Sequence, residues 1–174
     1  MAERADQEQK TRYFGEVDMR AAAGAGVVAA AASLVVLLLL APVMGVNAME
    51  PLYMIAAVVL GGEILAAAPV FNIGVVAAAV GVHLVLSLVY AFVLSAIIHN
   101  QSKAVGIGIG LGFGLMLYIL NLYFFTALFP WFVDGRNWVG VLAHIVWGVS
   151  VGWVYVRAEV VFPKRRPLSE QPVG

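Results

Sequence analysis

The chain has 174 residues, and 63% of them are apolar, against about 45–50% in soluble proteins. Charged residues make up only 11%, with ten basic residues balancing ten acidic ones. A soluble domain of this size cannot bury so much apolar surface in one core, so the composition indicates a membrane protein with the lipid bilayer as its solvent. The balanced charge offers no basic footprint for nucleic acid, and the lack of cysteine excludes disulfides, thiolate metal sites and cysteine nucleophiles.

Five apolar runs follow one another along the chain, at 21–46, 52–68, 73–98, 104–129 and 138–156. Four of them reach the roughly 20 residues that a helix needs to cross the hydrocarbon. The second run is shorter, lies between Pro51 and Pro69, and is interrupted by two glycines and Glu63. Because proline and glycine end helices, we expect this run to form a short helix that does not cross.

Basic residues predict the orientation, because Lys and Arg near the ends of spans are retained on the cytoplasmic side. They cluster before the first run and after the last, and Lys103 lies between the third and fourth. Both termini are therefore expected in the cytoplasm, which requires an even number of crossings. The sequence predicts an all-α bundle in the cell (inner) membrane, with four transmembrane helices and one short outer-side re-entrant or buried helix. The domain boundaries would be a polar cytoplasmic tail at 1–20, a transmembrane domain at 21–157 and a basic, flexible cytoplasmic tail at 158–174.

Small residues mark the expected contacts between helices. The segments HLVLSLVYAFV, from His83, and HIVWGVSVGWV, from His144, each carry small residues four and eight positions after the histidine, and the fourth run begins with glycine at every second position. In lipid, stripes of small residues let helix backbones approach closely. The predicted packing positions are Ser87, Ala91, Gly106, Gly110, Gly114, Gly148 and Gly152.

Few ionisable groups lie at membrane depth, and such groups are functional candidates. His83, Asn121 and His144 fall about 10–15 Å from the outer ends of their spans at 1.5 Å per residue, and Glu63 is placed to reach the same layer. Three interpretations stand. The polar groups bond one another and specify helix pairing; or His83 and His144 are axial ligands of a haem b; or Glu63 joins both histidines in the ion or proton site of a small transporter or channel.

Four segments carry a resemblance: PLYMIAAVVLGGE, GVHLVLSLVYAFV, NLYFFTALFPWF and LAHIVWGVSVGWVYV. In this order, over 51–157, the chain resembles a family of small bacterial multispanning membrane proteins, some of which are labelled as sodium:proline symporters. Sodium-coupled symporters are far longer chains with inverted repeats, so we do not adopt that label. The resemblance implies a recurring histidine-containing module in the outer half of the spans.

The sequence contains no nucleophile elbow, HExxH motif or paired carboxylates, so we expect no catalytic activity. Glycine on several spans favours contacts with further membrane helices. The sequence therefore predicts a non-catalytic membrane subunit or oligomer, with other membrane subunits or its own copies as partners, within a larger complex such as a respiratory or photosynthetic one. A haem-binding electron-transfer subunit and a small transporter or channel are the alternatives.

Overall fold

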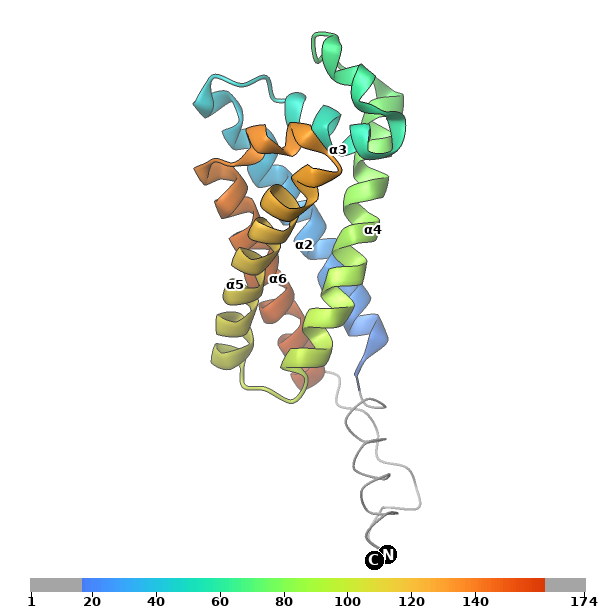
Figure 1. The fold of residues 1–174 in the computed structure, drawn as a ribbon. Coiled ribbons are helices and arrows are strands. Elements are labelled where there is room, and N and C mark those ends of the chain that lie inside the picture. Colours follow the sequence, from blue (N-terminus) through green and yellow to red (C-terminus); the bar gives the residue numbers. More distant parts are fainter. Residues whose placement is uncertain (1–16, 162–174) are drawn as a thin grey trace, which may run out of the picture.

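The computed structural model describes residues 17–161, and every regular element among them is helical. Within this range, four helical segments are long and apolar enough to cross a membrane, and they pack into one bundle (Figure 1). They are formed by α2 (Met19–Leu40), α4 (Ile73–Ile98), α5 (Lys103–Ile119) and α6 (Trp138–Val161). The span of α5 continues in further helical turns to Ala127. The chain is thus an all-α helical membrane protein, as its composition predicts. Most of the two predicted tails, at 1–16 and 162–174, lies outside the described residues.

Polar side chains fix where three of the long helices begin. The carboxylate of Asp18 accepts hydrogen bonds from two backbone N–H groups in the first turn of α2, Asn72 does the same for α4, and the Ser102 hydroxyl accepts one from α5. Each cap satisfies backbone donors that have no partner inside the helix. These residues separate the apolar runs, so each cap coincides with a border of a span.

The short second run forms α3 (Glu50–Leu60), an 11-residue helix, between the 3-10 segments η1 (Pro42–Met44) and η2 (Gly62–Ala66). Pro51 lies in its first turn, and Gly61, whose φ of +92° suits only glycine, ends it. Figure 1 shows α3 at the end of the bundle where α4 begins, and Tyr53 and Ala56 of α3 pack against Val75 and Ala79 of α4. This segment therefore stays at one end of the bundle. The predicted short helix that does not cross is confirmed.

The two ends of the bundle differ in what they carry (Figure 1). One, the α3 end, holds α3 and the 3-10 segments η4 (Phe125–Ala127) and η5 (Pro130–Gly135). The other, the turn end, holds the start of α2, the turn between α4 and α5, and the last residues of α6. Both ends of the described chain therefore lie on the same side, which agrees with an even number of crossings.

Helices α5 and α6 meet along a seam of glycines. A methyl group added to Gly110 would strike the carbonyl of Gly148, and one added to Gly148 would strike that of Gly110. Gly114 faces the backbone of His144 in the same way, and Gly106 and Gly152 continue the seam toward the turn end. On the other side of the core, Ala91 is fully buried and meets α2 at Gly26. At Gly110, Gly114, Gly148 and Gly152 the obstacle is the backbone of the facing helix, so a larger residue there would force the two helices apart.

Candidate functional site

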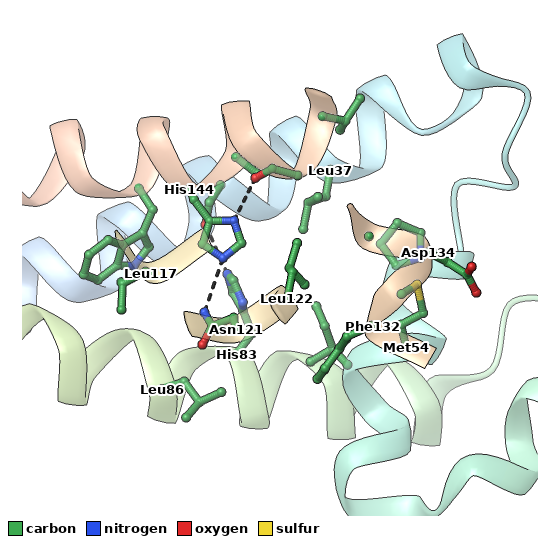
Figure 2. Close-up of a pocket in the computed structure, with 18 of the residues that line it drawn as sticks. Leu37, Met54, His83, Leu86, Leu117, Asn121, Leu122, Phe132, Asp134 and His144 are labelled. Atoms are coloured by element: carbon green, nitrogen blue, oxygen red, sulfur yellow. Dashed lines mark hydrogen bonds between the residues drawn. The ribbon is translucent and has the colours of Figure 1, made fainter. Parts of the chain in front are cut away.

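A cavity of about 310 Å³ lies in the half of the bundle near the α3 end, lined by residues of α2, α3, α4, α5 and α6. Two of the lining residues are the predicted histidines, so we name it the histidine cavity. Figure 2 shows His83, Asn121 and His144 together in one part of it, with Met54, Phe132 and Asp134 in another. Three of the four residues predicted for one polar layer are thus brought to a common space.

The imidazole of His83 is tied to α2. Its Nε2 lies 3.2 Å from the carbonyl oxygen of Ala30 and 3.1 Å from Oγ of Ser33. A carbonyl oxygen only accepts hydrogen bonds, and the Ser33 hydroxyl already donates to carbonyls of α2, so Nε2 carries the proton. In the neutral ring, Nδ1 is then a bare acceptor.

The imidazole of His144 belongs to a chain of hydrogen bonds across three helices. Its Nδ1 lies 2.7 Å from the Gly140 carbonyl, one turn earlier on α6, and therefore donates. Its Nε2 then accepts from the side-chain amide of Asn121 at 3.3 Å, and the amide oxygen accepts from the Tyr90 hydroxyl at 3.0 Å. This arrangement uses one of the two amide N–H bonds of Asn121 and leaves the other for a further partner.

Asn121 lies in a single π-helical turn, η3 (Leu120–Phe124), that follows α5. Arg136 holds this region from η5: its Nε donates to the Leu122 carbonyl at 2.7 Å and its Nη2 to the Thr126 hydroxyl at 2.8 Å. The guanidinium also lies 4.3 Å from the ring centre of Tyr123. π-Turns are rare and are frequent at functional sites, so the arginine stabilises an unusual backbone where a cavity residue is presented.

A second polar contact lies deeper in the bundle. The indole N–H of Trp147 donates to the Ser87 hydroxyl at 2.6 Å, and that hydroxyl donates to the Gly26 carbonyl at 2.8 Å. Trp147 is 5% exposed and Ser87 3%. The two side chains line the cavity and join α2, α4 and α6.

The structure does not bring Glu63 to this layer, which corrects the prediction. Its side chain is exposed on η2 and does not line the cavity. Glu63 follows Gly61 in an irregular segment at the α3 end, so its position along the chain does not translate into depth. Within residues 17–161, no group of three His, Asp or Glu side chains is placed to hold a metal ion. The site that was to combine Glu63 with both histidines is therefore absent from this part of the chain.

A haem b between the histidines does not fit the side chains present. Axial ligation requires a ring nitrogen from each histidine aimed at one iron, whereas Nε2 of His83 points to the Ala30 carbonyl and both nitrogens of His144 have partners. The cavity volume also lies at the lower limit of about 300 Å³ for ligand pockets.

The sequence did not lead us to several residues of the cavity, among them Tyr90, Glu50 and Asp134. Tyr90 lies two turns after His83 on α4, a spacing that would have placed the two on one face. The acidic residues Glu50 and Asp134 line the cavity from α3 and η5, and their place depends on irregular segments. No local signal in the sequence shows where such segments fold back.

The chain matches no family model, and no curated protein or solved structure matches it. The resemblance to small bacterial membrane proteins therefore stays a prediction, and the functional argument rests on the geometry.

Proposed function

We propose that this chain is a non-catalytic membrane subunit that assembles with further transmembrane helices, from its own copies or from other subunits of a larger complex. The observation that carries the proposal is the outer face of α5. Gly108 and Gly112 lie about 200° around the helix from the glycines of the seam, at 100° per residue. Both are exposed, and a methyl group added to either would meet nothing within 4 Å.

This face has the spacing of a helix-pairing surface. Val105, Gly108, Gly112, Leu115 and Ile119 follow one another at intervals of three and four residues, and all five are exposed. Such a stripe forms the seam of left-handed helix pairs, and glycine within it allows the close approach that drives association in lipid. The exposed face of α4 carries mainly valine, leucine and isoleucine, which suit acyl chains as well as they suit a partner.

We place the protein in the cell (inner) membrane of a bacterium with both termini in the cytoplasm. Lys103 and Arg157 support this orientation, because both lie at the turn end and basic residues are retained on the cytoplasmic side. Their charged groups lie 5.9 and 5.4 Å from the ring centre of Trp153. At the α3 end, Phe129, Trp131 and Phe132 form a cluster of rings, as expected for a membrane interface.

Native mass spectrometry of the protein extracted in mild detergent tests the proposal. We expect an assembly larger than one chain, which Gly108→Leu combined with Gly112→Leu converts to monomers whose far-UV circular dichroism is unchanged. Gly81→Leu is the matched control, because Gly81 is also an exposed glycine of a spanning helix with no neighbour within 4 Å. The proposal is contradicted if the unaltered chain is a monomer, or if Gly81→Leu dissociates the assembly as fully as the double variant does.

A further inference from the structure

Two hydrogen-bonding groups in the histidine cavity lack a partner among the described residues. One is Nδ1 of His83, an acceptor, since the proton of that ring is on Nε2. The other is the second amide N–H of Asn121, a donor, since the first faces His144. Figure 2 shows the two side chains in the same part of the cavity. The site therefore offers one donor and one acceptor to an occupant.

The other walls of the cavity are mainly apolar. Leu37, Met54, Leu122 and Phe132 face it. A space of 310 Å³ equals about ten waters at roughly 30 Å³ each, and every buried water needs about two to four polar partners. Most of the lining side chains are apolar, so few of these waters would meet a polar partner on the wall. An apolar body with one small polar group matches the cavity better.

The donor and acceptor together select the chemistry of that polar group. A hydroxyl donates one hydrogen bond and accepts others, so its chemistry matches both the acceptor of His83 and the donor of Asn121. An ether or a ketone only accepts, and would set its lone pairs against the lone pair of His83. A carboxylate also only accepts, and it would bring negative charge into a cavity lined by Glu50 and Asp134.

We infer that the histidine cavity binds a neutral, predominantly apolar molecule with one hydroxyl group, of the alcohol or phenol class. The hydroxyl donates to Nδ1 of His83 and accepts from the amide of Asn121, while the apolar body lies against Leu37, Met54 and Phe132. This site is separate from the outer face of α5, so it does not depend on the proposed assembly.

The test compares three probes on the unaltered protein in lipid nanodiscs: thymol, its methyl ether and decanoate. Binding is followed by the imidazole ¹⁵N resonances of His83. We expect thymol to bind saturably and to shift Nδ1 while Nε2 stays in place. The ether should bind about tenfold or more weakly, because it leaves a buried acceptor unpaired, and decanoate should not bind.

Asn121→Leu separates the hydroxyl effect from general partition into lipid. We expect this variant to lose the preference for thymol over the ether. Gln101→Leu, which removes a carboxamide from the exposed turn between α4 and α5, should keep it. If the unaltered protein binds thymol and the ether equally, or if His83 Nδ1 does not respond to thymol, the inference is wrong. The first result would mean that the cavity accepts apolar bodies by shape alone, and the second that the phenol stays in the bilayer.

Discussion

Substitutions in the glycine seam between α5 and α6 should lower the free energy of unfolding. Gly110→Ala adds one methyl group where the Gly148 carbonyl lies, and Gly148→Ala adds one against the Gly110 carbonyl. The obstacle is backbone in both cases, so the helices have to move apart. Gly81→Ala adds the same methyl group to α4, where nothing lies within 4 Å, and is the matched control.

The magnitude follows from two opposing terms. Alanine stabilises a helix interior by about 1 kcal/mol relative to glycine, and this gain is common to all three variants. Overpacking a tight contact costs about 1–3 kcal/mol, and this cost applies only at the seam. The seam variants should therefore have a free energy of unfolding about 1–3 kcal/mol below that of Gly81→Ala. Because Gly110 and Gly148 face each other, the double variant should lose less than the sum of the two single losses.

Unfolding by sodium dodecyl sulfate in mixed micelles, followed by far-UV circular dichroism, measures these differences. If Gly110→Ala and Gly148→Ala are as stable as Gly81→Ala, the backbones do not meet where the structure has them. Additive losses in the double variant would show that the two glycines do not share one contact.

Three further predictions concern other parts of the chain. Ser87→Ala should lower the free energy of unfolding by about 1–3 kcal/mol, because it leaves the buried indole N–H of Trp147 without its acceptor. Ser95→Ala should not lower it, because the Ser95 hydroxyl is buried without a partner among the described residues. Equal losses of the two variants in the same titration would contradict this. Asn100 has a φ of +60°, so Asn100→Val should cost about 1–2 kcal/mol while Asn100→Gly is tolerated, and the reverse order would refute the turn geometry. The chain has no cysteine, so thiol labelling of single-cysteine variants in intact cells reports orientation: Asp134→Cys should react with an impermeant reagent, Lys103→Cys should react only after lysis, and the opposite pattern would invert the topology.

The spans were predictable because their signals are local. Run length decides whether a helix can cross, and the capping residues Asp18, Asn72 and Ser102 occupy the polar gaps between runs. Within a straight helix, counting 1.5 Å per residue also gives depth, which is why the predicted common layer of His83 and His144 corresponds to a shared cavity. The lengths of the apolar runs and the helical rise per residue were therefore sufficient to predict spans and depths wherever the backbone is a regular helix.

Predictions from spacing fail where the backbone stops being regular. Glu63 comes two residues after Gly61, whose φ is +92°, and after such a turn the number of residues no longer measures depth. Asn121 lies in a π-helical turn, so the direction of its side chain depends on what holds that turn. Arg136 holds it by a hydrogen bond to the carbonyl of Leu122, 14 residues earlier in the chain. Contacts of this kind are made by tertiary structure, and the pattern of apolar residues does not encode them.

The glycine seam and the histidine cavity are parts of one construction. Side chains of a helix lean toward its N-terminus, and α6 begins at the α3 end, so the His144 ring extends from the seam toward that end. Gly114 of α5 touches the backbone of His144, and Asn121 follows Gly114 by seven residues, about two turns nearer the α3 end. The close approach of the backbones thus sets the distance at which the amide of Asn121 reaches Nε2 of His144. A bulkier seam would part the helices and break this bond, so residues chosen for packing also determine which donor the cavity presents.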